Sequence, residues 1–600
     1  MELETLYSQP LPSNRKGALY NAFPYPTKIS PEAIAIYIAC HTEVGDNILD
    51  PFAGSGTTGL ATLLCDTPTE EMISQTEKLG VKPKWGKRNA TLIELSTLGA
   101  AVAEAMCNPP DPQAFRKAAF QIISEVAGDL GDIYSIKDPE GNVGHIRYVI
   151  WSDVLNCPNC KSSTTFWDAA VNQSPLSIKD HFECPNCGFT QQMSTIKRIQ
   201  EKVHDPVLNK TITRKRRRPA WIYGKTGKKT WNRAAEPRDY KLLQDKLGAH
   251  SLANVPTHAM NWGVLHRKGY HSGITHLHHF YSDRNLLVFS KLWERTRQFP
   301  DSLKSALQTW LLSYNASHST LMSRVVVKKN SRDFVITGAQ SGVLYISSLP
   351  VEKNILEGVE RKIKTFYNAF GMVKKSNSKV TVINSSSTAI PLLDASQNYI
   401  FTDPPFGDYI PYSEINQINE AWLGRVTDNK EEVIVNTSQK KTTTQYGELM
   451  TQVFSEASRV LKPSGSMSLV FHSAKAEIWQ ALVKSFQEND FMVYFSNILD
   501  KMQGSFKQVT STVKVQGDAL VLLKKSEMRD DEEVCIESEK EVDLIRRIIY
   551  NSLSNGSSHD EKKPERVYSR YVTACLKSGI PISMDARQFY DVLAQEAPQV

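Results

Sequence analysis

A glycine-bearing turn between an apolar strand and a helix constrains the fold of this chain most. In "EVGDNILDPFAGSGTTGLATLL" the apolar run "NIL" ends at Asp50, the turn extends from Phe52 to Gly56, and a helix-like run continues to Leu64. Gly54 and Gly56 permit positive φ and close approach of the backbone, and the first N–H groups of the helix have no partner within it. A strand, a tight turn and a helix in this order predict a cradle for a polar ligand.

A second apolar strand supports this interpretation. "NATLIEL" runs to Glu94 and is followed by a helical pattern. Doubly wound folds place at such a strand end the carboxylate that binds ribose hydroxyls, although it follows the turn by roughly 20 residues there. Because Glu94 lies farther along the chain, we interpret the polar segment from Asp66 to Asn89 as an inserted loop.

A third strand leads into two consecutive prolines in "NYIFTDPPFGDYI". Proline fixes its own φ and donates no ladder hydrogen bond, so these residues alone are typical of a stiff loop start. Downstream, "VFSEASRVLKPSGSMSLVF" and "FMVYFSNILDK" predict a helix, a turn and two strands, and the apparent fold ends near Lys525. The predicted fold class is therefore α/β, a doubly wound sheet in two halves separated by a long insertion.

Length and composition indicate a multi-domain soluble chain. At roughly 100–200 residues per domain, 600 residues predict three or four units. No apolar run approaches the roughly 20 residues of a membrane helix, and the N-terminus lacks the apolar core of a secretory signal. We expect a cytoplasmic protein without membrane contact. The net charge of +7 is modest for this length, so nucleic-acid binding would need a local patch of basic residues.

Four of the nine cysteines form two CPNC pairs. Cys157 and Cys160 are separated from Cys184 and Cys187 by 23 residues, which is zinc-ribbon spacing. Without a histidine or carboxylate in the pattern, the site has no open catalytic position, so we predict structural zinc that holds a small β-unit. We expect this unit to present a surface.

A basic segment with interleaved aromatics follows the cysteines. "RKRRRPAWIYGKTGKKTWNR" contains nine Lys or Arg, three aromatics and no acid. These residue types suit phosphate contacts and stacking, and the glycine and proline content is compatible with a mobile loop that orders on DNA. The predicted nucleic-acid contacts are Arg214, Arg216, Arg217, Arg218, Trp221, Tyr223, Lys228, Lys229 and Trp231.

The remaining segments predict helices and packing. The histidines in "HRKGYHSGITHLHHF" do not match a known metal spacing, and we expect packing and phosphate contacts from them. Helical periodicity extends from about Tyr281 to Phe370, and it returns after the acidic run "SEMRDDEEVCIESEKEVD". The C-terminal helices predict a small accessory domain that suits a partner protein.

The paired motifs resemble one enzyme family. "DPFAGSGTTG", an acidic strand end and a later "DPPF" resemble S-adenosylmethionine-dependent DNA amino-methyltransferases, and "FPYPTKISPEAIAIYIACHTEVGD" looks like the segment that contacts the methionine part of the cofactor. The motif order is similar to the α arrangement, in which a target-recognition domain interrupts the fold. "TDPPFGDYIPYSEINQINEAWLG" and "HHFYSDRNLLVFSKLWE" look like large methyltransferases of bacterial anti-phage systems, with defence proteins as further partners. The cofactor-binding residues implied are Lys28, Asp50, Phe52, Ala53, Gly54, Ser55, Gly56 and Glu94.

The resemblance also implies a catalytic set at Asp403, Pro404, Pro405 and Phe406. An exocyclic amine is a poor nucleophile because its lone pair is delocalised into the ring. The Asp403 carboxylate and the Pro404 carbonyl would hold both amine hydrogens and aim the nitrogen at the methyl group. Phe406 would stack on a base rotated out of the duplex. Adenine N6 is favoured over cytosine N4, because the cytosine enzymes more often begin this motif with serine.

Two other functions stay open from the sequence. "DPPFG" also occurs in RNA guanine-N2 methyltransferases, although no RNA-binding domain is recognisable at the N-terminus. A catalytically silent DNA-binding subunit is the third hypothesis, because "TVINSSSTAIPLLDASQNYI" carries serines where an acidic adenosine contact is typical. The expected regions are 1–110 (cofactor-binding half), 145–195 (zinc ribbon), 196–370 (target recognition), 371–525 (catalytic half) and 526–600 (C-terminal helices).

Overall fold

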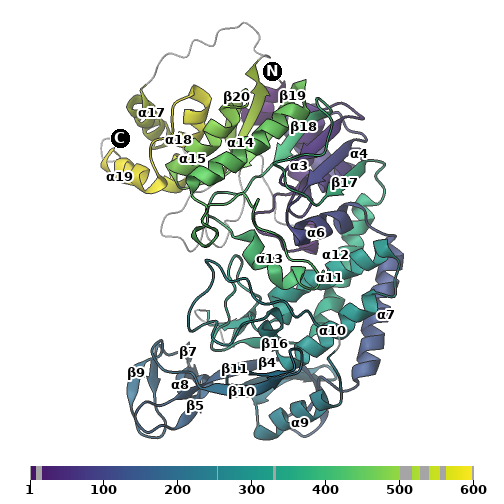
Figure 1. The fold of residues 1–600 in the computed structure, drawn as a ribbon, viewed down its shortest axis with the longest axis vertical. Coiled ribbons are helices and arrows are strands. Elements are labelled where there is room, and N and C mark those ends of the chain that lie inside the picture. Colours follow the sequence, from purple (N-terminus) through teal and green to yellow (C-terminus); the bar gives the residue numbers. More distant parts are fainter. Residues whose placement is uncertain are drawn as a thin grey trace. The chain divides into compact units, whose positions relative to one another are not determined.

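Strands from distant parts of the chain form one mixed sheet. The computed structural model describes residues 2–8, 17–252, 254–328, 333–499, 517–526, 540–553 and 562–596. The chain folds into two compact units, unit 1 (Met1–Asp111, Asn368–Ser413 and Thr427–Val600) and unit 2 (Pro112–Tyr367 and Glu414–Val426). In Figure 1, purple N-terminal elements and the green β18 and β19 belong to the same unit.

The sheet of unit 1 has seven strands in the order β17-β2-β1-β18-β19-β21-β20. The first five are parallel, and β21 runs antiparallel to both of its neighbours. A parallel-rich α/β sheet agrees with the predicted fold class. The strands are β1 (Asn47–Asp50), β2 (Asn89–Ile93), β17 (Lys379–Ile383), β18 (Gln397–Thr402), β19 (Leu461–Phe471), β20 (Phe491–Leu499) and β21 (Asp518–Lys525).

The pairing of β1 with β18 is what assembles the site. Ile48 lies opposite Tyr399 and Leu49 opposite Ile400, so strands about 350 residues apart in sequence are neighbours. All four side chains are fully buried, as expected for central strands of a parallel sheet whose two faces are both covered. The turns that follow Asp50 and Thr402 therefore leave the same edge of the sheet.

Helices cover the sheet of unit 1, and one of them corrects a prediction. The polar segment after Asp66 contains a helix, α5, and is not only a loop; Thr69 caps it by accepting a hydrogen bond from the Met72 N–H. The helices of unit 1 are α1 (Glu2–Ser8), α2 (Ala18–Ala22), α3 (Pro31–His41), α4 (Thr57–Asp66), α5 (Glu70–Leu79), α6 (Thr97–Cys107), η3 (Thr437–Gln439), α14 (Thr443–Val460), α15 (Ala476–Gln487), α17 (Glu541–Leu553), α18 (Pro564–Ser578) and α19 (Ala586–Glu596).

The C-terminal helices share the core of the sheet. Val567, Tyr568 and Tyr571 of α18 are fully buried in the same apolar cluster as Val521 and Leu523 of β21. α18 lies against β20 and β21, so these helices are built into unit 1. The predicted acidic linker lies mostly outside the described residues.

Unit 2 contains a second sheet, ordered β13-β12-β4-β16, with β3 and β5 also paired to β4. Its strands are β3 (Ser135–Lys137), β4 (Val143–Asn156), β5 (Ser163–Thr165), β6 (Val171–Gln173), β7 (Leu176–Ile178), β8 (His181–Glu183), β9 (Thr190–Gln192), β10 (Gln200–Asp205), β11 (Lys210–Lys215), β12 (Arg217–Thr226), β13 (Lys229–Ala234), β14 (Arg324–Val326), β15 (Val335–Thr337) and β16 (Val351–Lys353). Its helices are α7 (Pro112–Leu130), α8 (Phe166–Ala170), α9 (Pro237–Gly248), η1 (Leu277–Phe280), α10 (Asp283–Thr296), α11 (Asp301–Tyr314) and η2 (Asn315–Ser319). Helices α12 (Ile355–Val373) and α13 (Tyr412–Glu420) each contribute residues to both units.

Two predictions for this region are wrong. The basic segment is not a mobile loop, because it forms the end of β11 and the strands β12 and β13; β12 pairs with both β4 and β13. The helical periodicity assigned to residues 281–370 holds for α10, α11 and α12, but the residues between α11 and α12 include β14, β15 and β16. Short strands that pair with distant segments leave little periodic signal in the local sequence.

Within the described residues, no helix combines the length and apolarity needed to cross a membrane.

Candidate functional site

The Asp50 carboxylate anchors the glycine turn through hydrogen bonds. Its Oδ1 accepts hydrogen bonds from the Phe52 N–H (3.0 Å) and the Thr402 hydroxyl (2.9 Å), and its Oδ2 accepts one from the Thr58 hydroxyl (2.6 Å). The carboxylate thus ties the turn after β1, the first residues of α4 and the end of β18 together. Burial raises the pKa of Asp50 to about 6, and these three hydrogen bonds oppose the shift.

Both predicted glycines have the backbone geometry that the turn requires. Gly54 has φ 53° and Gly56 has φ 82°. A Cβ on Gly56 would lie 2.8 Å from the Cβ of Ala103, so a larger residue would be strained in conformation and also clash with α6. The turn therefore brings the backbone close to α6 and leaves one side open.

Glu94 follows β2 and braces the same turn. Its Oε2 accepts a hydrogen bond from the Gly54 N–H (2.6 Å), and its Oε1 accepts one from the Ser96 N–H (2.7 Å). Ser96 in turn caps α6 by accepting from the Gly99 N–H. The carboxylate is thus fixed at the edge of the cavity by two backbone donors.

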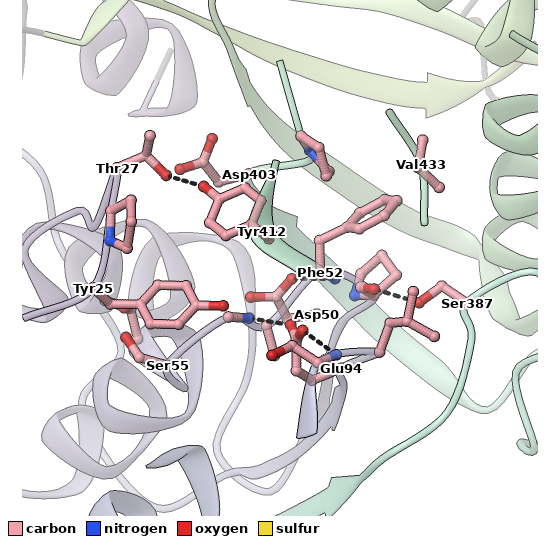
Figure 2. A pocket seen from close by; sticks show the side chains of 18 of the residues that line it. Tyr25, Thr27, Asp50, Phe52, Ser55, Glu94, Ser387, Asp403, Tyr412 and Val433 are labelled. Carbon is pink, nitrogen blue, oxygen red and sulfur yellow. Dashed lines mark hydrogen bonds between the residues drawn. The ribbon is translucent and has the colours of Figure 1, made fainter. Parts of the chain in front are cut away.

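One cavity of about 1090 Å³, its open mouth included, joins the two predicted motifs (Figure 2). From the N-terminal half it is lined by Lys28, Asp50, Phe52, Ala53, Gly54, Ser55 and Glu94, and from the later half by Asp403 and Pro405. Gly56, Pro404 and Phe406 are not among its lining residues. The Lys28 ammonium is buried and donates to the carbonyls of Leu19 (3.1 Å) and Tyr20 (3.3 Å).

The Asp-Pro-Pro-Phe turn is anchored through its second proline. The Pro405 carbonyl accepts hydrogen bonds from the buried Tyr446 hydroxyl (3.0 Å) and from the Gly407 N–H (3.0 Å). The Phe406 ring, 8% exposed, packs edge-on against Phe471 with centroids 5.3 Å apart. Phe406 therefore forms part of the core beneath the turn.

A pair of tyrosines that the sequence analysis missed lines the same cavity. The rings of Tyr25 and Tyr412 are stacked at 5.9 Å and 16°, and the Tyr412 hydroxyl lies 3.0 Å from the Thr27 hydroxyl (Figure 2). Burial raises the pKa of Tyr412. Both tyrosines belong to the motif segments "FPYP" and "YIPYSE", and this proximity to the motifs was the available signal.

Two serines line the cavity at the position where the resemblance implies an acidic residue that contacts the adenosine of the cofactor. Ser386 and Ser387 line the cavity, and the Ser387 hydroxyl donates to the Pro51 carbonyl. Ser387 thus ties the segment after β17 to the glycine turn.

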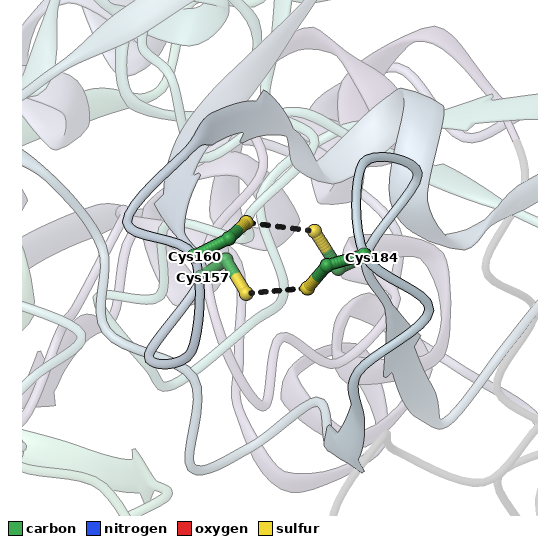
Figure 3. A group of neighbouring side chains, drawn as sticks. Cys157, Cys160 and Cys184 are labelled. Atoms are coloured by element: carbon green, nitrogen blue, oxygen red, sulfur yellow. Dashed lines mark hydrogen bonds between the residues drawn. The ribbon is translucent and has the colours of Figure 1, made fainter.

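The four cysteines converge in unit 2 (Figure 3). Their sulfur atoms all lie within 4.8 Å of one another, with Cys157 and Cys187 at 3.8 Å and Cys160 and Cys184 at 3.6 Å. A tetrahedral zinc with bonds of about 2.3 Å separates its thiolates by about 3.8 Å. The donor set and spacing are compatible with a structural zinc between the loops after β4 and β8.

Most of the predicted nucleic-acid residues lie on β11, β12 or β13, and most of the charged ones are paired with acids. Arg216 and Arg218 contact Glu201 at 3.2 and 3.3 Å, and Arg214 contacts it at 3.6 Å. Arg217 pairs with the buried Asp153, Lys229 pairs with Glu140, and Lys228 is exposed in the turn between β12 and β13. Tyr223 and Trp231 are buried, and Trp221 stacks on Trp167 at 5.4 Å. Arg214 also pairs with Asp283 at 3.4 Å, so three arginines and two carboxylates leave one net positive charge there.

Two of the predicted histidines meet a carboxylate that the sequence did not indicate. His278 Nε2 and His279 Nε2 lie 2.8 and 2.9 Å from Asp205 Oδ2, and the three groups could hold a metal ion by position. However, His279 Nδ1 accepts a hydrogen bond from the Thr275 N–H, so the proton of the neutral ring sits on Nε2 and donates to Asp205. This tautomer favours a hydrogen-bonded clasp between β10 and η1 over a metal site.

One family model matches both segments that carry the two motifs. Residues 3–66 and 398–580 match a family model described as DNA methylase. These segments contain the glycine turn and the Asp-Pro-Pro-Phe turn, whereas Glu94 and the four cysteines of the CPNC pairs lie outside them. Over these two segments, the chain is thus similar to DNA methylases.

Among solved structures, the antibiotic-resistance methyltransferase Kmr aligns at 14% identity over 28% of this chain and 71% of its own, with a TM-score of 0.15. Geranyl diphosphate C-methyltransferase from Streptomyces coelicolor A3(2) aligns at 7% identity over 28% of this chain and 59% of its own, with a TM-score of 0.14. No match was found among curated proteins.

Proposed function

We propose that this chain methylates an exocyclic amine of a DNA base with S-adenosylmethionine, and that the base is adenine, modified at N6. The proposal rests on one observation: the glycine turn after β1 and the Asp-Pro-Pro-Phe turn after β18 line the same cavity. Parallel strands bind ligands in the crevice at their carboxyl ends. A cofactor held by the first turn and an amine held by the second would therefore meet.

The residues of the cavity fit the cofactor. The glycine turn brings backbone close to a ligand at the start of α4, and the neighbouring Glu94 carboxylate suits ribose hydroxyls. S-adenosylmethionine supplies an electrophilic methyl group when bound. The serines in place of an acid at residues 386 and 387 offer hydroxyl groups to the adenosine part, which predicts weaker cofactor binding than an acid would give.

Asp403 is the proposed positioning acceptor. Its carboxylate and the Pro404 carbonyl would accept both hydrogens of the amine and direct its lone pair toward the methyl donor. The hydrogen bonds from Tyr446 and Gly407 to the Pro405 carbonyl hold this turn without using the two acceptors. Because Phe406 lies outside the lining, the stacked tyrosines at 25 and 412 are the aromatic surface that we expect a flipped base to meet first.

The four cysteines and the basic strands complete the proposal. Structural zinc would hold the hairpins of residues 157–192 together, and the arginines around Glu201 would contact DNA phosphates. We infer a cytoplasmic role in DNA modification or anti-phage defence. Reduced phage plating on cells carrying the gene, lost with Asp403→Ala, is the expected result.

The test incubates the full chain with labelled S-adenosylmethionine and duplex DNA, single-stranded DNA or tRNA, followed by digestion to nucleosides. N6-methyldeoxyadenosine is the expected product, and Asp403→Ala should abolish its formation while zinc content and cofactor binding stay. If N4-methyldeoxycytidine forms instead, the target base is cytosine and not adenine. Methylguanosine in tRNA would favour an RNA methyltransferase. DNA binding without transfer to any substrate would favour the silent subunit.

A further inference from the structure

A cluster of basic side chains, two of them cationic, lies in unit 2 at the end of α11. His318 belongs to η2, a π-helical turn, and its Nδ1 lies 2.9 Å from the Lys353 ammonium at the end of β16. The His318 ring also contacts Tyr314 with centroids 4.8 Å apart. Arg361 of α12 hydrogen-bonds to Tyr314 and acts electrostatically on both His318 and Lys353. The turn η2 and the consecutive elements β16 and α12 thus bring three basic groups together, and π-turns are frequent at functional sites.

The cluster carries little compensating negative charge. Among the residues that the structure describes, Glu357 is the acid paired with it, at 3.7 Å from Arg361, and Glu357 is shared with Lys225 at 2.9 Å. No ion pair to Lys353 or His318 is found in the same set of residues. Burial, followed by the charge of Arg361, lowers the pKa of Lys353 to about 8, and burial followed by Lys353 lowers the pKa of His318 to about 3. Lys353 is thus a partly buried cation beside the charge of Arg361, which costs free energy unless an anion accompanies it.

This cluster differs from the basic segment found in the sequence. There, Arg216, Arg217 and Lys229 each contact an acid. The cluster at His318 has a lower share of acids, although no run of basic residues marks it in the sequence. It is the stronger candidate for binding an external anion.

The adjoining sheet surface favours a nucleic acid over a free anion. Lys353 lies opposite Tyr148 in the β16–β4 ladder, and Tyr148 lies opposite Tyr223 in the β4–β12 ladder. Paired residues on neighbouring strands point to the same face, and the two tyrosine rings are stacked at 4.4 Å. Tyr148 is only half-buried, so a basic group and an aromatic ring lie side by side at the margin of this face. Binders of single-stranded nucleic acid combine these two groups, and a basic group alone suffices to contact a duplex phosphate.

We propose that His318, Lys353 and Arg361 form a phosphate-binding site for the DNA backbone. The Arg361 guanidinium, whose side chain is 69% exposed, offers paired donors to phosphate oxygens, and Lys353 supplies a fixed charge deeper in the cluster. The identification of the phosphate as that of DNA rests on the proposed function. Binding at this site contributes affinity and register without reading sequence.

The test measures binding of the full chain to a fluorescent duplex of random sequence at several salt concentrations. Lys353→Gln removes the charge but keeps a donor for His318 Nδ1, and Arg361→Gln changes an exposed side chain, so both variants should fold. Each should weaken binding several-fold at low salt and reduce the slope of log K against log salt by about 0.9 per lost phosphate contact. Lys304→Gln, at the other end of α11, is the matched control with an unchanged slope.

Unchanged slopes in both variants would overturn the proposal. A thermal shift of the wild-type chain by inorganic phosphate that is lost in Lys353→Gln, with unchanged DNA slopes, would reassign the site to a free anion. A slope change seen with duplex RNA and not with DNA would reject DNA as the source of the phosphate. Because binding is measured without turnover, failure of methyl transfer by the wild type would refute the proposed function and leave this result standing.

Discussion

The buried carboxyl of Asp50 should make the stability of the cofactor-free protein depend on pH. Its pKa rises from an ordinary value of 3.8 to about 6 because the group is fully buried. Because the pKa of Asp50 is higher in the folded state, its protonated form contributes to folding stability. This contribution is complete below the pKa of the unfolded state and is lost as pH rises through the pKa of the folded state. A shift of about 2 pKa units corresponds to about 3 kcal/mol, lost between roughly pH 4 and pH 7.

Asp50→Asn isolates this contribution. The amide oxygen can still accept from the Phe52 N–H and the Thr402 hydroxyl, and the amide nitrogen can donate to the Thr58 hydroxyl in place of Oδ2. The variant therefore keeps the packing and removes the titration. The unfolding free energy of Asp50→Asn minus that of wild type should be about 3 kcal/mol larger at pH 7.5 than at pH 4.

Thermal unfolding of both proteins without cofactor, from pH 4 to pH 8, measures this difference. At roughly 1–2 °C per kcal/mol for a unit of this size, the Tm of Asp50→Asn minus that of wild type should rise by about 3–6 °C over the range. Asp490→Asn, at an exposed aspartate of the same unit, controls for the change in net charge. A Tm difference for Asp50→Asn that stays constant with pH, or follows that of Asp490→Asn, would refute the argument.

Three further predictions concern the site and the zinc ribbon. Tyr446→Phe removes the hydroxyl that holds the Pro405 carbonyl and should lower kcat about 2- to 10-fold with an unchanged KM for cofactor; an unchanged kcat would show that the turn needs no such anchor. Tyr412→Leu should lower kcat/KM for DNA by the roughly 1–3 kcal/mol of a stacked base, whereas Tyr412→Phe keeps the ring and most of the activity; equal losses in both variants would exclude stacking. Cys184→Ser should reduce bound zinc, measured by metal analysis after dialysis, and lower the Tm of the ribbon; full metal retention would contradict the four-thiolate site.

Local order along the chain explains which parts of the site could be predicted. The glycine turn, the strand end at Glu94 and the CPNC pairs each lie within a few residues, so residue type and spacing suffice to indicate them. Asp403 and Pro405 were predicted as part of the site from a similar short motif, and they line the cavity with Asp50. Helix α5 was missed because its apolar residues are few, with Met72 and Thr76 its buried positions.

Long-range contacts explain what could not be predicted. The arginines at 214–218 share charge with Glu201 and Asp153 through strand pairing, and no local pattern reveals these partners. Asp205 meets His278 and His279 across more than 70 residues, which changes a histidine run into a hydrogen-bonded clasp. The position of Phe406 in the core likewise depends on Phe471 of β19.

The sequence by itself determined the chemistry of the turns and the cysteine pairs, because backbone freedom at glycine, rigidity at proline and thiolate spacing are properties of neighbouring residues. Only the tertiary structure decided which side chains share a cavity and which charges are compensated. The register of β1 against β18 brings Asp50 and Asp403 to one cavity, and the meeting of η2, β16 and α12 creates a cationic cluster from residues that are unremarkable in sequence. Both outcomes depend on the burial of apolar strands and helices against one another, which acts over the whole chain and leaves no local signature at the polar residues it brings together.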